Sequence, residues 1–328
     1  MKKKIAITLG DPAGIGPEII VKALLLHPDI YEITIPIVFG HRQLIERARR
    51  WTGLPADIRE LDDPRQVDEG STQNIYCIRF TELSQLPGPG KISAEGGRLA
   101  FGYIRTAIQS AQQGLVQAVV TAPIHKEALK LGGVPYLDHT EMLAKLTHSA
   151  HPMTLFVTGP LRIFFYSRHI PFRQIADHLD KERLVQTLRQ CSTYMKQIGF
   201  DNPRMALAAL NPHGGEGGMF GSEEIDILIP AVTEARLSGI SVEGPIPADS
   251  VFHLARNGHF DAVLSLYHDQ GHIAAKTFDF DHTVSLTMGL PFLRTSVDHG
   301  TAMDLAGKNQ ANEISMVEAI KAAVKYCW

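Results

Sequence analysis

The chain has 328 residues, of which 44% are hydrophobic, and carries a formal net charge of −3 at pH 7. This length suffices for a large buried core, usually divided into two domains, and the charge gives no support for nucleic acid or an anionic membrane as a partner. No apolar stretch is long enough to span a bilayer, and the N-terminus enters a predicted strand without a signal peptide. Three scattered cysteines, Cys77, Cys191 and Cys327, are typical of free thiols. We therefore expect a cytoplasmic protein.

Short apolar runs alternate with longer helical patterns along the chain. The predicted strands are Ile5–Leu9, Thr34–Phe39, Ile75–Phe80, Ala118–Thr121, Thr154–Val157, Ile163–Tyr166, Met205–Ala209 and Ala262–Tyr267. The predicted helices are Pro17–Leu26, Glu95–Gln113, Lys181–Lys196, Glu223–Leu237 and Ile314–Tyr326. This alternation predicts an α/β fold with largely parallel strands, in which ligands bind at the carboxyl ends of the strands.

The first strand runs into the first helix through a turn that contains Gly10, Gly14 and Gly16. Such a turn lets the backbone approach a ligand, and a helix N-terminus favours anionic groups. The spacing matches neither the P-loop nor the Rossmann fingerprint. The turn therefore indicates a phosphate or carboxylate site, with a plain tight connection as the alternative.

Three histidines each follow a predicted strand. His169 lies in Ser-Arg-His-Ile-Pro, His213 in Asn-Pro-His-Gly-Gly-Glu-Gly-Gly, and His268 in Tyr-His-Asp-Gln-Gly. Imidazole is a common ligand of catalytic metals, and three protein ligands leave a coordination position open. The pattern predicts a divalent-metal site, although a single histidine of this kind is more often structural. Asp269 could be a further ligand or could orient His268.

Two further groups of polar residues are candidates for ligand binding. His139 and Thr140 open a helical pattern after Asp138, and Lys276 and Arg294 lie downstream of His268. Hydroxyl, amide and cationic groups of this kind could hold an anion, but each charged residue could equally be solvated or paired. The other group is the glycine-containing turn 298–308 with residues 311–313, which could simply be a loop and a capped helix.

Several of these motifs resemble known families. Gly-Asp-Pro-Ala-Gly-Ile-Gly-Pro-Glu-Ile at 10–19 resembles the G-D-G-I-G-P-E turn of isocitrate and isopropylmalate dehydrogenases. His-Gly-Thr-Ala-Met-Asp-Leu-Ala-Gly at 299–307, with Asn312, resembles their segment that binds the adenosine end of NAD(P). The motifs at 121–126, 139–141, 211–218, 267–271 and 289–302 narrow the match. The chain is thereby identified as resembling the 4-hydroxythreonine-4-phosphate dehydrogenase family over essentially its whole length.

The resemblance implies a two-domain α/β/α architecture like that of isocitrate dehydrogenase, with the active site in an interdomain cleft and no classical Rossmann fingerprint. The first domain would comprise residues 1–125 and 275–328, and would hold the cofactor. The second domain would comprise residues 126–274, and would hold the metal histidines and the interface of a homodimer. Within that dimer, the resemblance implies that His268 is the ligand donated by the partner subunit.

The resemblance also implies a role for each matching residue. The metal ligands would be His169, His213 and His268. The substrate contacts would be His139, Thr140, Lys276, Ser285 and Arg294. The NAD contacts would be His299, Gly300, Thr301, Ala302 and Asn312. Lys276 or a metal-bound water would carry the proton, and Asp269 is the other catalytic candidate. The sequence does not say which basic group holds phosphate and which holds carboxylate.

Ser285 departs from the family pattern, because the biosynthetic members have asparagine at that position. The family includes relatives that act on 4-phospho-D-threonate and 4-phospho-D-erythronate, whose C2 carries a hydroxyl in place of an ammonium group. The shorter side chain of Ser285 changes the contact made there. This substitution favours a 2-hydroxy acid as the substrate.

The predicted reaction is an NAD- and metal-dependent oxidation at C3 with loss of the C1 carboxylate as CO2. With 4-phospho-D-threonate the product would be dihydroxyacetone phosphate. The alternative substrate is 4-phosphooxy-L-threonine, which would give 3-amino-2-oxopropyl phosphate for pyridoxal phosphate synthesis. The metal could be Zn²⁺, Co²⁺, Ni²⁺, Mn²⁺ or Mg²⁺, and only the family pattern favours NAD over NADP. Rival interpretations are a metallohydrolase, an acyltransferase and a non-catalytic metabolite sensor.

Overall fold

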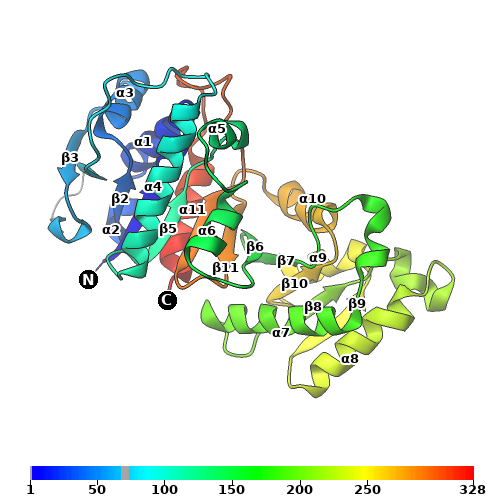
Figure 1. Cartoon of the computed structure of the whole chain (residues 1–328). Helices are drawn as coiled ribbons and strands as arrows, with labels where there is room; N and C mark the ends of the chain where they lie inside the picture. Colours follow the sequence, from blue (N-terminus) through cyan, green and yellow to red (C-terminus); the bar gives the residue numbers. More distant parts are fainter. Residues whose placement is uncertain (1, 68–73) are drawn as a thin grey trace. The chain divides into compact units, whose positions relative to one another are not determined.

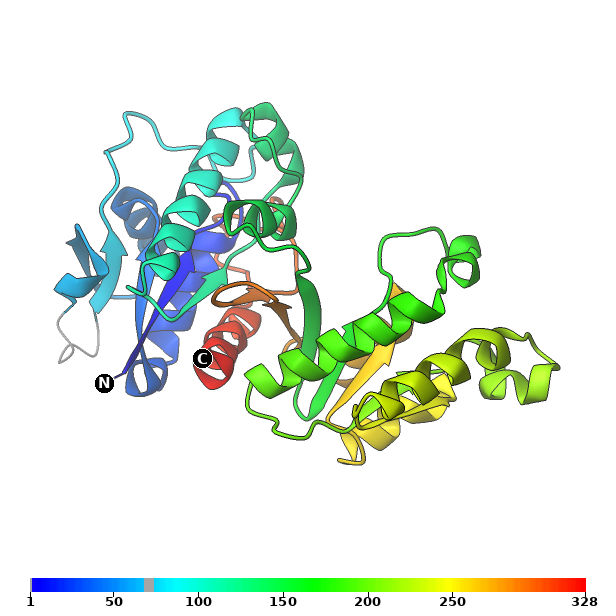
Figure 2. The same ribbon diagram turned by 60° about the horizontal axis from the view of Figure 1, so that its bottom comes forward.

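The computed structural model describes residues 2–67 and 74–328. The chain forms two compact units, one made of Met1–Pro152 and Val284–Trp328 and the other of Met153–Thr283 (Figures 1 and 2). Both units are α/β, as the sequence predicts. Across the described parts of the chain, no helix is both long enough and apolar enough to cross a bilayer.

Among the described residues, the sheet strands of the first unit lie in the order β3-β4-β2-β1-β5-β12-β11. All of its strands run parallel except β11, which pairs antiparallel with β12. The strands are β1 (Lys3–Thr8), β2 (Thr34–Phe39), β3 (Asp57–Leu61), β4 (Asn74–Ile78), β5 (Ala118–Thr121), β11 (Val284–Met288) and β12 (Leu293–Val297). The chain moves outward from β1 in one direction through β2 and in the other through β5. The carboxyl ends of β1 and β5 therefore form the kind of switch point at which α/β sheets bind ligands.

Helices cover both faces of this sheet. They are α1 (Gly16–Leu26), α2 (Ile30–Ile33), α3 (Arg42–Thr52), α4 (Ala94–Gln112), α5 (Lys126–Leu131), α6 (His139–Leu146) and α11 (Ile314–Tyr326). Helices α1, α3 and α11 pack together, whereas α4 packs with α5 and α6 and crosses in front of the strands in Figure 1. Because both faces are covered, β2 is buried along its whole length, and its sequence Thr-Ile-Pro-Ile-Val-Phe is a nearly continuous apolar run.

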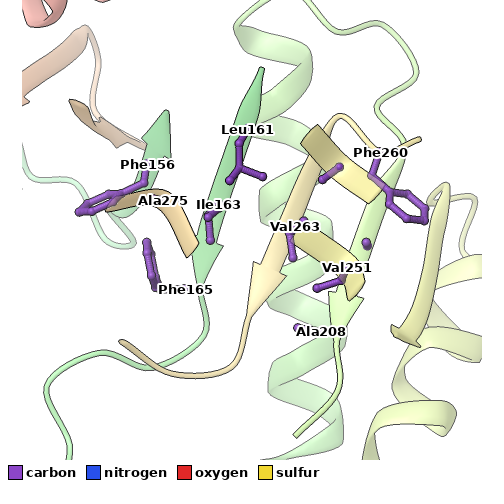
Figure 3. Packing of buried hydrophobic residues seen from close by; sticks show 11 residues of the cluster. Phe156, Leu161, Ile163, Phe165, Ala208, Val251, Phe260, Val263 and Ala275 are labelled. Carbon is purple, nitrogen blue, oxygen red and sulfur yellow. The ribbon is translucent and has the colours of Figure 1, made fainter. Parts of the chain in front are cut away.

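The sheet strands of the second unit lie in the order β6-β7-β10-β8-β9. Its strands are β6 (Met153–Thr158), β7 (Leu161–Phe165), β8 (Met205–Ala208), β9 (Val242–Ile246) and β10 (Ala262–Ser265). Its helices are α7 (Lys181–Gln197), α8 (Ile229–Leu237), α9 (Ala248–Arg256) and α10 (His268–Phe278). Phe165, Val263 and Ala208 pack against Val251 of α9 and Ala275 of α10 (Figure 3). This core holds α10 against the strands of the second unit through Ala275.

The unit boundaries differ from those expected from the sequence. The expected first boundary follows residue 125, but residues 126–152 belong to the first unit, because α5 and α6 pack on α4. The expected return at residue 275 comes later, because α10 packs on β6, β7 and β10 and remains in the second unit through Thr283. The cleft in which the resemblance places the active site stays a prediction.

Gly10 has a left-handed backbone conformation and packs closely against the backbone at Pro123. Its φ is +70°, and a Cβ atom added there would lie 2.4 Å from the carbonyl oxygen of Pro123. We expect Gly10→Ala to lower the free energy of unfolding by about 2–5 kcal/mol, through left-handed strain plus the clash. Gly53 is a matched control, since its φ is +69° but nothing lies within 4 Å of an added Cβ.

Gly53→Ala should cost only the conformational term, about 1–2 kcal/mol. Urea unfolding followed by circular dichroism measures both variants. Equal losses would show that the turn between β1 and α1 yields to a side chain, which would contradict the close approach to Pro123.

Candidate active site

Three neighbouring parallel strands of the second unit carry the candidate metal ligands. Strand β10 lies between β7 and β8 and runs parallel to both. His169 follows β7, His213 follows β8, and His268 is the first residue of α10, directly after β10. Because parallel strands end at the same edge of a sheet, all three histidines belong to one edge.

His169 and His268 are neighbours within one chain. Their ring centroids are 6.0 Å apart, and the rings are inclined by 39°. The Nδ1 atom of His268 lies 2.6 Å from Oδ1 of Asp269, and its ring stacks on His272 at 3.6 Å. A carboxylate on one ring nitrogen directs the other toward a metal. Asp269 thus contacts His268 in the manner of an orienting group, the second of the two roles considered for it.

His213 lies in a loop with an uncommon backbone. Residues 213–217 all have positive φ values, 54° at His213 and 45° at Glu216, and glycines occupy the three other positions. Each non-glycine residue in such a conformation costs about 1–2 kcal/mol. The glycine-rich sequence therefore limits this strain to two residues, and one of them is the candidate ligand.

The donor set suits a divalent metal, because it consists of imidazoles of which one already has a carboxylate partner. Within the described parts of a single chain, however, no three histidine, cysteine or acidic side chains gather closely enough to hold an ion. Of the three candidate ligands, His169 and His268 are the pair whose rings are neighbours, with centroids 6.0 Å apart.

The first unit contains a buried cation held by hydroxyl groups. Arg294 on β12 is only 5% exposed. Its Nε and Nη2 atoms donate to Thr121 Oγ1 at 3.0 and 2.6 Å, and Nη1 donates to Thr287 Oγ1 at 3.1 Å. Sequence reasoning found Arg294 but missed these two threonines. Both threonines could have been identified from the sequence, because each is a polar residue inside or at the end of an otherwise apolar strand.

Ser285 lies beside this cation. On the antiparallel pair β11–β12, Ser285 is opposite Ser296 and Thr287 is opposite Arg294. Directly opposed residues project from the same face of a sheet, so the four side chains share one face. Ser296 also contacts Thr121, with 3.1 Å between the hydroxyl oxygens. Ser285 is therefore placed to influence what Arg294 binds.

His139 is the first residue of α6, and Thr140 follows it in the first turn. The residue is partly exposed, but its Nε2 atom is buried and finds no hydrogen-bond partner among the described residues. Burial of the ring, and then the positive charge of Arg294, hold the pKa of His139 well below its usual value. His139 is therefore neutral at pH 7. An anionic ligand could pair with Arg294 and accept a hydrogen bond from His139.

The segment 299–312, the candidate cofactor site, is fastened to the turn and helix that follow β1. The carbonyl oxygen of Thr301 accepts a hydrogen bond from the backbone N–H of Ile15 at 3.0 Å. The Glu18 carboxylate accepts a hydrogen bond from the backbone N–H of Ala311 at 2.9 Å. The Lys22 Nζ atom donates to the carbonyl oxygen of Ala311 at 2.8 Å. Glu18 and Lys22 are themselves paired at 2.9 Å and buried. The two glycine-containing motifs thus form one structural element.

Within this segment the predicted residues have different environments. The Nδ1 atom of His299 lies 3.0 Å from the carbonyl oxygen of Gly300, whereas its buried Nε2 has no partner among the described residues. Ala302 has a positive φ of 39°. The side-chain oxygen of Asn312 accepts a hydrogen bond from the backbone N–H of Ile314, the first residue of α11, at 2.8 Å. The unpaired imidazole nitrogen fits a ligand-binding role for His299.

The predicted substrate residues are divided between the two units. His139, Thr140, Ser285 and Arg294 belong to the first unit, whereas Lys276 belongs to the second. Lys276 lies on α10, the helix that begins with His268, and its Nζ atom is 5.1 Å from the centre of the Phe280 ring. One helix therefore carries both a candidate metal ligand and the candidate proton carrier.

Comparisons with known proteins agree over almost the whole chain. The model of the family described as "Pyridoxal phosphate biosynthetic protein PdxA" matches residues 32–323. A Clostridium botulinum protein named "Putative D-threonate 4-phosphate dehydrogenase" is 45% identical, over 99% of this chain and 97% of its own. A like-named Halalkalibacterium halodurans protein is 47% identical, with 99% and 98% covered.

Among solved structures, 4-hydroxythreonine-4-phosphate dehydrogenase from Klebsiella pneumoniae superimposes with a TM-score of 0.91. It is 40% identical in sequence, and the match covers 99% of this chain and 98% of that one. The extent of these matches, together with the two-unit α/β fold and the motifs at its strand ends, shows that the chain belongs to the PdxA family.

Proposed function

We propose that this protein is an NAD- and divalent-metal-dependent dehydrogenase that oxidises C3 of a 4-phosphorylated four-carbon hydroxy acid. The C1 carboxylate then leaves as CO2. The favoured substrate is 4-phospho-D-threonate, or 4-phospho-D-erythronate, and the product is dihydroxyacetone phosphate. The observation that carries the proposal is the buried Arg294 beside a neutral His139 whose Nε2 atom has no partner among the described residues. The names of the relatives and the serine at position 285 support the choice of a 2-hydroxy acid.

The residues that would hold the metal are His169 and His268 of one chain and His213 of a second copy. The adjacency of His169 and His268 supports this division, whereas the family resemblance assigned the partner's contribution to His268. When bound, a divalent ion would supply Lewis-acid stabilisation for the negative charge that develops on the C3 oxygen. Asp269 would keep His268 oriented by its contact with Nδ1.

The residues of the first unit would bind and align the substrate. The fixed charge of Arg294, held by Thr121 and Thr287, would pair with an anionic group, and His139 and Thr140 would donate hydrogen bonds to it. Binding energy from the remote phosphate would fix the position of C3. Lys276 would carry the proton released from the C3 hydroxyl or the proton added after loss of CO2.

The segment 299–312 would bind the dinucleotide, with the buried Nε2 of His299 available to it. NAD would supply the hydride acceptor when bound. Because Glu18 and Lys22 hold Ala311 through its backbone, the position of this segment does not depend on exposed side chains. The proposed reaction balances in electrons. Oxidation of the C3 alcohol transfers two electrons to NAD, and the decarboxylation involves no net oxidation or reduction.

A second candidate substrate is 4-phosphooxy-L-threonine, which the name of the Klebsiella pneumoniae relative favours. The two substrates differ in the C2 substituent, so the contact made by Ser285 should discriminate between them. A metallohydrolase would use the same histidines without NAD.

The deciding experiment is an NADH absorbance assay with added Mn²⁺ or Co²⁺. We expect NADH to form with 4-phospho-D-threonate and 4-phospho-D-erythronate much faster than with 4-phosphooxy-L-threonine. The matched variant Ser285→Asn should shift this preference toward the amino acid, because an amide replaces the small hydroxyl.

D-threonate without its phosphate is the control substrate. We expect D-threonate to be oxidised more slowly and to bind more weakly than 4-phospho-D-threonate, since the 4-phosphate would align the C3 carbon for oxidation. A strong preference for 4-phosphooxy-L-threonine would reverse the substrate assignment. Phosphate release without NADH would favour the hydrolase instead.

A further inference from the structure

One buried carboxylate of the second unit, that of Glu224, packs against the loop that carries His213. Glu224 is only 2% exposed, and it opens the π-helical turn Glu224–Leu228 that leads into α8. Sequence reasoning did not select it, because Glu223-Glu224 reads as the start of an ordinary helix. A π-helical turn is rare and is frequently found at functional sites.

The Glu224 carboxylate accepts hydrogen bonds from the residues that follow β8. Its Oε1 atom accepts from the backbone N–H groups of Leu210 and Asn211, both at 2.8 Å. Its Oε2 atom accepts from the Asn211 side-chain amide at 2.8 Å. Three donors to one carboxylate offset the cost of burying its charge. The carboxylate thereby fixes the two residues that precede Pro212 and His213.

The same carboxylate also contacts the far side of the loop. A Cβ atom added at Gly215 would lie 2.9 Å from Glu224 Oε2, so Gly215 packs directly on this oxygen. Glu224 thus touches the chain both before and after His213, whose own side chain is exposed. The left-handed backbone from 213 to 217 is strained, and a strained loop keeps one conformation only when its surroundings determine it.

We propose that Glu224 is a positioning residue that holds His213 in the orientation needed to bind the metal ion. This inference rests on the proposed function, because it requires His213 to be a metal ligand. Glu224 itself does not contact the metal in this arrangement. It acts through the backbone at 210–211 and through Gly215.

The test is a Co²⁺ titration of the metal-free full-length protein, followed by the visible absorption of the bound ion. We expect Glu224→Ala to weaken Co²⁺ binding by about 10–100-fold and to change the spectrum. Glu224→Gln should retain most of the affinity, because its carbonyl oxygen can still accept from both backbone N–H groups. Glu223→Ala is the matched control, since Glu223 accepts a hydrogen bond from the Asn211 side chain at 2.6 Å but, within residues 2–67 and 74–328, from no backbone N–H of this loop.

A second pair of variants covers the case in which Glu224→Ala does not fold. Gly215→Ala and Gly217→Ala both place a side chain at positive φ, 80° and 63°, but nothing lies within 4 Å of a Cβ atom at Gly217. Only Gly215→Ala presses on the carboxylate. We expect it to weaken Co²⁺ binding by at least tenfold relative to Gly217→Ala.

Thermal unfolding and sedimentation confirm that each variant is folded and has the wild-type oligomeric state. Wild-type affinity and spectrum in Glu224→Ala, or equal losses in the two glycine variants, would overturn the role of Glu224 alone. Failure of the wild-type protein to bind Co²⁺ would instead reject the metal site of the proposed function.

Discussion

Replacing Arg294 with methionine is expected to lower kcat/KM by about a thousandfold on the preferred substrate. Two charge-assisted contacts to an anion would be lost, together worth about 4 kcal/mol. The change would also leave the hydroxyls of Thr121 and Thr287 without the donor that they now share. Steady-state NADH kinetics at several substrate concentrations would measure the loss.

Two further variants separate the charge of Arg294 from its geometry. Arg294→Lys keeps the charge but cannot contact both threonines and an anion at once, so we expect an intermediate loss of about 10–100-fold. Thr121→Val removes the hydroxyl that accepts two of the guanidinium donors, and it should raise KM more than it lowers kcat. Arg189→Met, at an exposed position on α7, is the control and should leave kinetics unchanged. Activity of Arg294→Lys within threefold of the wild type would show that the buried guanidinium is structural.

A mixed dimer of His213→Ala and His268→Ala chains is expected to recover about half of the wild-type activity, although each variant alone is inactive. If His169 and His268 come from one chain and His213 from the other, the mixed dimer contains one intact site out of two. Two affinity tags, one on each chain, allow the mixed dimer to be purified before NADH formation is measured.

The pairing of His169→Ala with His268→Ala is the matched control. Because both ligands would belong to the same chain, neither site of that mixed dimer is complete, and it should stay inactive. Recovery in this control would instead assign His169 and His268 to different copies, as the family resemblance implies. Inactivity of every purified mixed dimer would mean that all three ligands come from one chain.

The sequence predicts the parallel core of both sheets well, because these strands are buried on both faces. The expected strands Thr34–Phe39 and Ala118–Thr121 coincide with β2 and β5, and the helix Ile314–Tyr326 coincides with α11. Each is an uninterrupted apolar run or an amphipathic pattern of ordinary length. Such patterns depend on local sequence alone.

The strands that were missed have other kinds of sequence. Strands β11 and β12 carry Ser285, Thr287, Arg294 and Ser296, so the pattern of this hairpin, which holds the candidate substrate residues, is too polar to indicate buried strands. β9 contains a glycine and a proline, and β3 has charged residues at an exposed edge. Polar residues can contact a ligand, but they also interrupt the apolar pattern from which a strand is predicted.

In the candidate site, too, some features could be predicted from the sequence and others could not. The strand-end histidines could be found from sequence, because each follows an apolar run within a few residues. The contacts that hold the site could not, since Thr121 and Arg294 are 173 positions apart and meet only through the pairing of β5 with β12. The role of Glu224 likewise depends on the fold, because it contacts backbone atoms that any residue would provide.

The interrupted first unit has a consequence for synthesis on the ribosome. Strand β5 pairs with β12, and α11 packs on β1, β5 and β12, so residues 284–328 complete a sheet whose other strands are made much earlier. The second unit is continuous in sequence, so all of its residues are present once residue 283 has emerged. The edge of β5 that pairs with β12 therefore has no partner strand until residues 293–297 have been translated. Loss of residues 284–328 would consequently remove three elements from the first unit and leave the sequence of the second unit complete.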